Sequence, residues 1–339
     1  MDKKIQRNFL WIALLILGTI WILARHNRTI PYQIDNGLIF GTVYKVTYQY
    51  DENLKEEIEA ALKRFDGSLS PFNDTATITR VNHNEDFVPD TFFINVFRRS
   101  MEISKETDGA FDITVAPLAN AWGFGFKKGT FPDSAMIDSL QEITGYTKVN
   151  LSAEGKVMKQ DPRIMLSCSA IAKGYAVDVI AQLLEQKGIR NFMVDIGGEI
   201  VVRGENPKKD LWRIGINKPV DDSLSMNQEI QTVLNITNIG MATSGNYRNY
   251  YYKDGKKYAH TIDPRTGYPV QHNILSATVI ARDCMSADAY ATAFMVMGLE
   301  EAEQFANAHP DIDAYFIYSD ENGKLQTFLT NGMEKYVSK

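Results

Sequence analysis

Apolar and polar residues follow patterns along the chain that predict its secondary structure. Residues 42–50 alternate, as expected of a strand with one buried face. Residues 52–66 carry apolar side chains every three or four positions, which predicts an amphipathic helix. The other predicted elements are helices at 90–109, 170–188, 284–298 and 300–309, a hairpin at 147–161, and strands at 163–169, 191–204, 211–217, 229–237, 247–252, 275–281, 313–319 and 324–330.

The order of these elements predicts the fold class. Strands dominate in long runs and helices are inserted between them, which is typical of an α+β fold with largely antiparallel sheets. The body shows no internal linker rich in Pro, Gly or Ser. We therefore interpret residues 37–339 as one domain, preceded by a short linker at 29–36 and an N-terminal segment at 1–28.

The N-terminal segment has a different pattern. Residues 9–24 form a run of 16 uncharged, mostly apolar residues with basic residues on both sides. Such a run is either a cleaved secretory signal or a membrane anchor. It is slightly shorter than the ~20 residues that span a bilayer, although flanking arginines can reach the interface. Because no small-x-small cleavage site precedes Arg25, we expect an uncleaved anchor with an exported body.

Charge limits the classes of partner. The chain has a formal net charge of −6, and because residues 1–28 are basic, the remainder is more acidic still. An acidic body offers no electrostatic footprint for nucleic acid. An anionic ligand would need backbone amides, a Lys or Arg, or a bound cation. The two cysteines, Cys168 and Cys284, are too few for a disulfide framework.

Two segments place polar groups where predicted elements begin or break. Ser169 could cap the helix at 170–188, and Lys173 lies near its first turn, where the helix dipole disfavours a cation. A bound anion would explain Lys173, and a solvated lysine is the simpler alternative. The Gly197–Gly198 pair before Glu199 indicates either a close approach of another group or a bulge.

Three loops carry residues suited to ligand binding. The turn-rich stretch IDPRTGYP contains Arg265 and follows His260, and ATSGNY places Thr243 at a strand end. The segment TDGAFDITVAPLANAWGFG contains Asp112 and ends in an aromatic, glycine-rich stretch that suits a planar ring. The structural alternatives are tight surface turns and a hydrophobic plug.

Asp288 and Thr292 lie four residues apart in an otherwise apolar helix, so they share one face. A carboxylate and a hydroxyl are hard oxygen ligands that suit Mg²⁺. Alternatively, Asp288 accepts a hydrogen bond from a neighbouring amide and Thr292 bonds back to the Asp288 carbonyl. A buried carboxylate needs a partner in both cases, so the residues alone leave the two interpretations balanced.

Taken together, these segments resemble the ApbE family of FAD:protein FMN transferases. TDGAFDITVAPLANAWGFG, SAIAKGYAVD, VDIGGE, ATSGNY, HTIDPRTGYPV and ADAYATAFMVMG occur in the family's order and at about its spacing, from about Gly41 to the C-terminus. The resemblance implies an ApbE-like fold and Mg²⁺-dependent transfer of the FMN half of FAD to a Thr or Ser of an acceptor protein, with release of AMP. The family's acceptors are typically subunits of membrane electron-transfer complexes. Its members are exported, which implies a protein of the inner membrane with its body in the periplasm.

The resemblance also implies roles for individual residues. Phe72 stands where a Tyr often stacks near the isoalloxazine ring, Ser167 replaces a frequent acidic residue, and Glu199 replaces a frequent Asp. The acceptor hydroxyl needs a base, for which we favour His260 over Asp288. The implied magnesium ligands are the Ala170 carbonyl, Asp288 and Thr292; the implied flavin-dinucleotide residues are Asp112, Lys173, Asp178, Gly197, Gly198, Glu199 and Thr243; His260 and Arg265 would lie by the diphosphate.

Two alternative functions and one disulfide remain as hypotheses. The same residues would serve an FAD pyrophosphatase, in which water replaces the acceptor hydroxyl. A non-catalytic flavin-binding envelope protein would not need the metal pair. If Ala170 and Asp288 share a metal, Cys168 and Cys284 would be close neighbours, and a disulfide could join the two halves of the site if its strict geometry is met.

Overall fold

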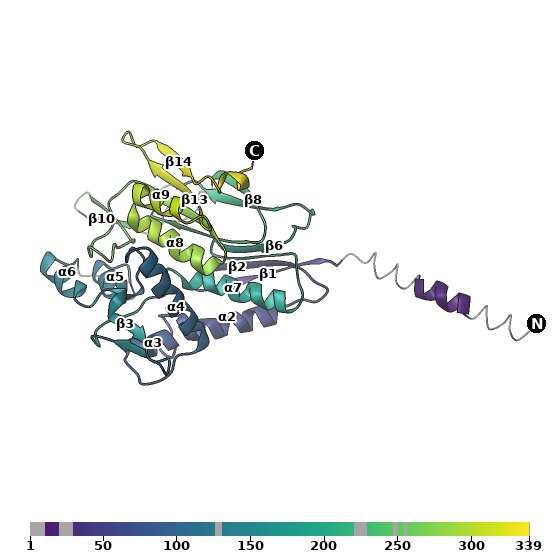
Figure 1. The fold of residues 1–339 in the computed structure, drawn as a ribbon, viewed down its shortest axis with the longest axis horizontal. Coiled ribbons are helices and arrows are strands. Elements are labelled where there is room, and N and C mark those ends of the chain that lie inside the picture. The colour runs from purple at the N-terminus through teal and green to yellow at the C-terminus, as the bar shows by residue number, and fades with distance from the viewer. Residues whose placement is uncertain are drawn as a thin grey trace, which may run out of the picture.

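A large antiparallel sheet forms the centre of the molecule (Figure 1). The computed structural model describes residues 11–19, 30–125, 131–219, 229–246, 250–253 and 256–338. Within them, eight strands form this sheet in the order β1-β2-β5-β6-β9-β12-β13-β14, and every neighbouring pair is antiparallel. These strands are β1 (Tyr32–Ile39), β2 (Thr42–Gln49), β5 (Phe192–Ile196), β6 (Glu199–Arg203), β9 (Ile239–Gly245), β12 (Ile274–Ala281), β13 (Asp313–Ser319) and β14 (Leu325–Leu329).

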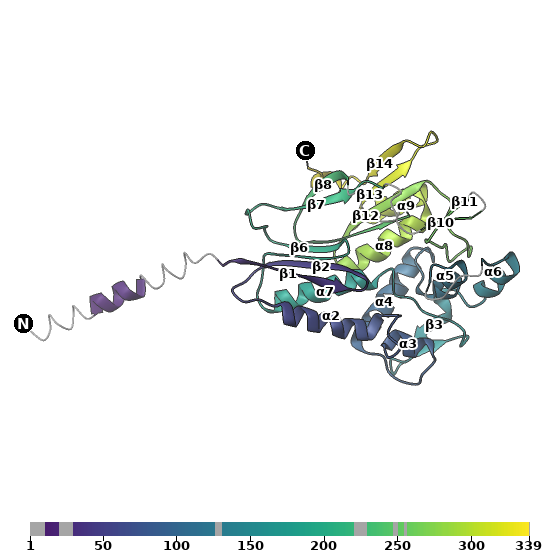
Figure 2. The ribbon, with the colours of Figure 1, turned by 180° about the vertical axis from the view of Figure 1, so that it is seen from behind.

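Helices cover one face of the sheet. In the described part of the body, the α-helices are α2 (Lys55–Leu69), α3 (Thr77–Asn82), α4 (Thr91–Glu106), α5 (Ala116–Trp122), α6 (Ser134–Gln141), α7 (Ala172–Gln186), α8 (Cys284–Met297) and α9 (Leu299–Ala308). Helices α7 and α8 pack directly on the central strands, while α2 packs on α7 and α4 packs on α8 (Figures 1 and 2). The main hydrophobic core lies between these helices and the sheet.

The opposite face is covered by a two-stranded sheet, β7 (Trp212–Asn217) with β8 (Ile230–Ile236). Trp212 and Leu234 of this small sheet pack against Val202 and Met241 of the large one, which forms a second core. The other two-stranded sheets are β3 (Val149–Leu151) with β4 (Val157–Lys159), and β10 (Tyr250–Lys253) with β11 (Lys256–Ala259). The predicted α+β class with antiparallel sheets is confirmed.

Three predicted elements differ from the structure. Strand β1 begins at Tyr32, inside the stretch predicted as a linker. Residues 163–169 form no strand, because their backbone groups bond to single partners outside the sheets: Leu166 exchanges hydrogen bonds with the Asn82 side chain at the end of α3, and Ser167 N–H donates to the Ile113 carbonyl. The strand predicted at 191–204 is the β5–β6 hairpin. Its turn is Gly197–Gly198, with positive φ at both residues, as a tight two-residue hairpin turn requires.

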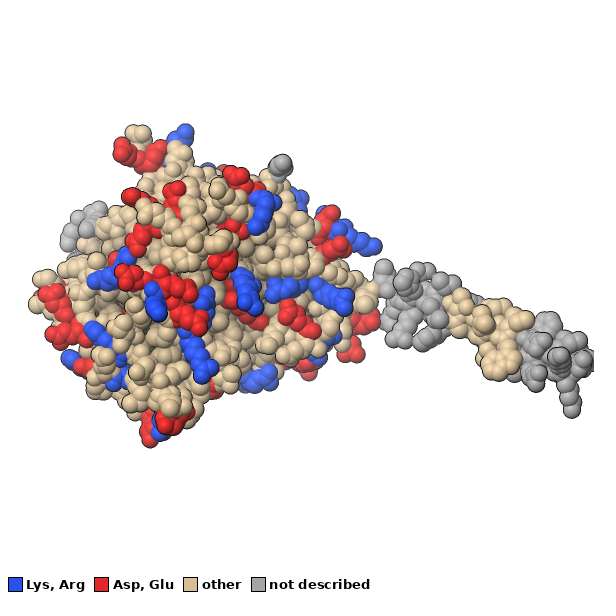
Figure 3. Space-filling view, viewed as in Figure 1, with Lys and Arg blue, Asp and Glu red and all other residues tan. Residues whose placement is uncertain are grey.

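Residues 11–19 of the N-terminal segment are helical, and the rest of the 9–24 run lies outside the described residues. In the part of the chain that the structure describes, no helix combines the length and apolar character needed to cross a membrane. The predicted anchor therefore stays a prediction. On the face of the body drawn in Figure 3, acidic and basic side chains are intermingled, so neither sign dominates that face.

Candidate functional site

Segments that are far apart in sequence meet around a cleft with a cavity volume of about 380 Å³. Its walls come from the chain before and within α5, the start of α7, the β5–β6 turn, the end of β9, the loop after β11, and one side of α8. This cleft is lined by nine of the residues that the sequence analysis assigned to the site: Asp112, Ala170, Lys173, Gly197, Glu199, Thr243, His260, Asp288 and Thr292.

Helix α8 carries the buried carboxylate of the cleft. Asp283 caps the helix by accepting a hydrogen bond from Ser286 N–H at 2.7 Å, and Gly298 ends it with a positive φ. The helix is buried on nearly all sides, because its other residues are mostly small or apolar. Asp288 is 6% exposed, and Thr292 lines the same cleft one turn later. Both oxygens therefore face the same space, as the spacing of four residues predicted.

Asp288 accepts a hydrogen bond from the first turn of α7. Its Oδ2 accepts from Gly174 N–H at 3.0 Å. Helix α7 begins at Ala172 with Ile171 as its N-cap, so the Gly174 N–H is one of the free amides of the first helical turn. Ala170 precedes the N-cap and lines the cleft, so its carbonyl lies outside the hydrogen-bond ladder of α7. The predicted hydrogen bond from a backbone amide to Asp288 and the predicted ligand role are compatible, because one oxygen of Asp288 serves the amide.

The close crossing of α7 and α8 depends on Gly174. A Cβ at this position would lie 2.3 Å from the carbonyl oxygen of Cys284 and 2.8 Å from Cβ of Asp288. Gly240 plays the same part beneath the helix, since a Cβ there would lie 2.4 Å from Cys284 N. Both glycines remove side-chain volume so that α8 can approach α7 and β9, and this approach brings Asp288 to Ala170.

The donor set fits a hard divalent cation. No group of three or more His, Cys, Asp or Glu side chains that could hold a metal occurs within the described ranges. A metal here would therefore be held by mixed oxygen donors, and a carbonyl, a carboxylate and a hydroxyl from Ala170, Asp288 and Thr292 are such a set. Mg²⁺ typically takes one or two carboxylates and completes its shell with water and phosphate oxygens.

Lys173 forms an ion pair with Glu199 on the wall of the cleft. The distance from Lys173 Nζ to Glu199 Oε1 is 2.5 Å, and the Glu199 side chain is almost fully buried. Burial raises the pKa of Glu199, and the positive charge of Lys173 opposes this shift. Burial works against the charge of Lys173, but Glu199 and Asp288 raise its pKa nevertheless. The anion expected beside Lys173 is therefore a side chain of the protein itself.

Asp112 organises the opposite wall. Its Oδ1 accepts from the Thr114 N–H and hydroxyl, both at 2.7 Å, and its Oδ2 accepts from Tyr146 N–H at 2.6 Å. Burial raises the pKa of Asp112, and these hydrogen bonds oppose the shift. Since both oxygens are occupied by the protein, Asp112 shapes the wall by joining the chain before α5 to the turn at Tyr146. On the sheet, the hydroxyls of Thr243 and Thr278 are hydrogen-bonded at 2.8 Å.

Four residues assigned to the site do not line the cleft. Phe72 is 82% exposed at the surface. Arg265 binds Asp263 at 3.1 Å and Glu301 at 2.9 Å, because the turn that carries it folds back on its own Asp. Gly198 lies in the hairpin turn, where Gly197 and Glu199 on either side of it reach the cleft and it does not. The fourth, Asp178, lies behind the cleft.

Asp178 holds the N-terminus of α8. Its Oδ1 accepts from Cys284 N–H at 3.0 Å and its Oδ2 accepts from Met285 N–H at 2.8 Å. These are free amides of the first helical turn, which favour a negative partner. Asp178 therefore positions the helix that carries Asp288, a role that the sequence prediction did not include.

We expect Asp178 to make stability depend on pH. Burial raises its pKa to about 7, well above the 3.8 of a free side chain, although its backbone hydrogen bonds oppose the shift. The folded state then binds more protons than the unfolded state between these values, so the free energy of unfolding falls as the pH rises from about 4 to about 7. Urea unfolding at several pH values should show a shallower pH slope for Asp178→Asn than for wild type. Equal slopes would contradict the assignment.

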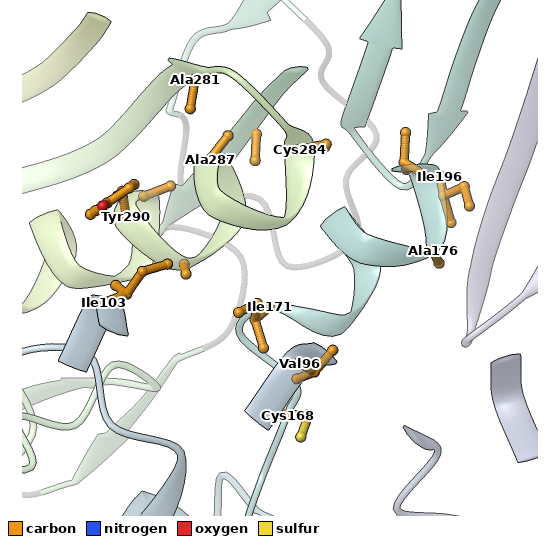
Figure 4. Close-up of a cluster of buried hydrophobic side chains, with 14 of the residues drawn as sticks. Val96, Ile103, Cys168, Ile171, Ala176, Ile196, Ala281, Cys284, Ala287 and Tyr290 are labelled. Atoms are coloured by element: carbon orange, nitrogen blue, oxygen red, sulfur yellow. The ribbon is translucent and has the colours of Figure 1, made fainter. Parts of the chain in front are cut away.

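The hypothesised disulfide is not present. Cys168 and Cys284 are both free and buried. Figure 4 shows Cys284 on the first turn of α8 and Cys168 beside Val96, before α7. The Cys284 thiol donates to the Met241 carbonyl at 3.2 Å, so it faces the sheet beneath α8 rather than Cys168. The two chain segments meet through Gly174 and Asp288 instead.

Three residues that shape the site were missed. Gly174 and Gly240 interrupt a helix and a strand, and an isolated Gly in such a pattern indicates a close packing contact. That signal was present in the sequence and could have been used. Thr278, the partner of Thr243, gave no such signal, since a Thr in a strand is ordinary.

Comparison with known proteins agrees with this geometry. The profile of the ApbE family matches residues 40–316. The chain is 33% identical to the FAD:protein FMN transferase of Vibrio cholerae over 96% of this chain and 99% of that one, and 38% identical to that of Escherichia coli K12 over 84% and 82%. The solved flavin transferase ApbE from Vibrio cholerae superposes with a TM-score of 0.80 at 32% identity, covering 90% of this chain and all of that one. The ApbE protein of Thermotoga maritima gives a TM-score of 0.78 at 25% identity, covering 91% of this chain and all of that one. The chain is a member of the ApbE family.

Proposed function

We propose that this protein is a Mg²⁺-dependent FAD:protein FMN transferase. It moves the FMN half of FAD to a Thr or Ser hydroxyl of an acceptor protein and releases AMP. Relatives named for this activity span nearly the whole chain. The observation that carries the proposal for this chain is that Ala170, Asp288 and Thr292 line one cleft, where the hydrogen bond from Gly174 N–H to Asp288 holds the start of α7 against α8.

The oxygen donors Ala170, Asp288 and Thr292 would hold the cation. When bound, Mg²⁺ would neutralise the negative charge of the diphosphate, which phosphoryl transfer requires above all. The body is acidic, and Lys173 supplies most of the positive charge on the cleft wall, so a bound cation would be needed to neutralise a diphosphate there. The aromatic side chains of Phe111 and Phe124 line the same cleft and offer apolar surface for a planar ring.

We propose that His260 accepts the proton of the acceptor hydroxyl. The hydroxyl oxygen would attack the FMN phosphorus, the bond from that phosphorus to the bridging oxygen would break, and AMP would leave with that oxygen. His260 lies in the cleft wall, and the centroids of its ring and the Phe124 ring are 6.5 Å apart in an edge-to-face arrangement. A neutral imidazole has one ring nitrogen that can accept a proton, which suits a general base.

One experiment separates this function from its alternatives. The protein is incubated with FAD, MgCl₂ and a candidate acceptor, and the products are followed by in-gel flavin fluorescence and by AMP release. A fluorescent acceptor with stoichiometric AMP supports the transferase. AMP and free FMN without a labelled acceptor would favour the pyrophosphatase, and bound FAD without turnover would favour a flavin-binding protein.

We expect His260→Gln to lower kcat of FMN transfer by about 10²-fold. Glutamine keeps much of the shape of histidine but cannot take up a proton at neutral pH, so binding of FAD should be nearly unchanged. Stopped assays give kcat, and quenching of FAD fluorescence gives its affinity. His83→Gln is the matched control, because His83 is exposed and lies outside the cleft lining. An unchanged kcat for His260→Gln would assign the base elsewhere.

The N-terminal segment supports a location at the inner membrane with the body in the periplasm. Its apolar run with basic flanks is long enough to hold the chain at a bilayer, and an anchored transferase would reach acceptor subunits of membrane electron-transfer complexes. Fractionation of cells that express the full chain, or a chain starting at residue 30, tests the location. Recovery of both in the same soluble fraction would contradict it.

A further inference from the structure

Two buried carboxylates and one ammonium group share the cleft wall. Glu199 is 2% exposed and Asp288 is 6% exposed, and both line the cleft together with Lys173. With all three groups charged, their formal sum is −1. Burying two carboxylates together is unfavourable unless a cation compensates them.

Lys173 supplies that compensation from a single turn of α7. Its Nζ lies 2.5 Å from Glu199 Oε1, and it also interacts electrostatically with Asp288. The next residue, Gly174, donates its N–H to Asp288. One turn of backbone therefore holds both carboxylates, the first through a side-chain charge and the second through an amide.

In the described part of the chain, only one of the two oxygens of the Glu199 carboxylate has a partner in this arrangement. Its Oε2 is buried and has no hydrogen-bond partner among the described residues. The Lys173 side chain is 35% exposed, whereas the Glu199 side chain is 3% exposed, so Lys173 is the more exposed member of the pair. A cation bound in the cleft would share its wall with the charge of Lys173 as well as with the two carboxylates.

We propose that Lys173 is the built-in counter-cation of the Glu199–Asp288 pair and that it limits how tightly the cleft holds a divalent cation. This inference rests on the proposed function and concerns the regulation of the same site. Lys173 stabilises the metal-free protein by neutralising one of the two carboxylates. The same charge repels Mg²⁺ and keeps its binding weak and reversible, because charges a few ångströms apart interact strongly in a cleft wall of low dielectric.

The test is a double-mutant cycle on Mg²⁺ binding without FAD. The full-length protein is titrated with MgCl₂ by calorimetry, and its thermal unfolding is recorded with and without MgCl₂. The variants are Lys173→Gln, Glu199→Gln and the double variant, and Lys173→Arg is the control that keeps the charge. The formal charge of the trio is −1 in wild type, −2 with Lys173→Gln, 0 with Glu199→Gln, and −1 again in the double variant.

The affinity for Mg²⁺ should rise as the formal charge of the trio becomes more negative. Lys173→Gln should bind Mg²⁺ about tenfold more tightly than wild type, Glu199→Gln about tenfold more weakly, and the double variant should return close to wild type. Lys173→Arg should also bind like wild type. Metal-free Lys173→Gln should melt at a lower temperature than wild type, and MgCl₂ should restore more of its stability.

Three outcomes would overturn the inference: equal or weaker Mg²⁺ binding by Lys173→Gln, a double variant weaker than both single variants, or no Mg²⁺ binding by any form. If Lys173→Gln does not fold, the Mg²⁺ affinities of the double variant and of Glu199→Gln still test the inference. The double variant replaces the ion pair with two neutral amides, and it should bind Mg²⁺ more tightly than Glu199→Gln. FMN transfer by wild type is measured separately. If wild type transfers FMN but the Mg²⁺ affinities of the variants do not follow their formal charges, only this inference is overturned. If the affinities follow the charges but wild type does not transfer FMN, only the proposed function is overturned.

Discussion

Asp288→Asn is expected to lower the rate of FMN transfer by about 10³-fold. Asparagine keeps the shape of the side chain and one oxygen that can accept the hydrogen bond from Gly174 N–H. The negative charge is lost, however, so the cleft would hold a divalent cation far more weakly. Initial rates at increasing MgCl₂ concentrations measure the effect, and circular dichroism checks that the fold is retained.

The matched control is Asp283→Asn in the same helix. Asp283 caps α8 through Ser286 N–H, and asparagine caps a helix about as well as aspartate. The control removes the same charge from the same helix at a position outside the cleft lining, so transfer should stay close to wild type. Wild-type transfer by Asp288→Asn, with the same dependence on MgCl₂, would overturn the metal assignment.

Gly174→Ala is expected to destabilise the protein by about 3 kcal/mol or more and to abolish most of its transfer activity. The new Cβ would lie 2.3 Å from the Cys284 carbonyl oxygen, which is backbone and cannot rotate away. Helices α7 and α8 would have to separate, and the hydrogen bond from residue 174 to Asp288 would stretch. Chemical unfolding measures the first effect, and transfer assays well below the unfolding temperature measure the second.

Gly67→Ala makes the same substitution where no contact opposes it. Gly67 is exposed near the end of α2, and nothing lies within 4 Å of the position of its Cβ. Alanine should stabilise this helix by about 0.5–1 kcal/mol and leave transfer unchanged. The same chemical change is thus expected to have opposite signs at the two sites. A neutral effect at residue 174 would contradict the close crossing of the two helices.

The candidate site shows which kinds of residue a motif can predict. Asp288 and Thr292 were paired correctly because a helix places residues four apart on one face. Arg265 was assigned to the diphosphate from its turn, but its guanidinium binds Asp263, two residues earlier in the same turn. Phe72 was assigned from its neighbours in sequence and is instead exposed. Side chains on surface turns have several partners within reach, so their position in a motif predicts their direction poorly.

Asp178 and Glu199 show that a motif does not reveal partners that are distant in sequence. Both lie in recognisable motifs, and both bind partners more than twenty residues away: Asp178 the amides of Cys284 and Met285, and Glu199 the ammonium of Lys173. Nothing in the spacing of these residues specifies such pairs, because the pairs form only when β6, α7 and α8 are packed together.

The sequence alone determined helices α2, α4, α7, α8 and α9, most strands, the antiparallel α+β class and the family resemblance, since these depend on local periodicity and on short motifs. It did not predict the short helices α3, α5 and α6. Tertiary structure decided what the polar residues of those motifs do. In the folded chain Cys168 and Cys284 are not bonded, Asp178 binds the N-terminus of α8 instead of lining the cleft, and Lys173 pairs with Glu199. The physical reason is that a buried charge is stable only with a partner, and the partner is whichever group the packing of the helices on the sheet brings within reach.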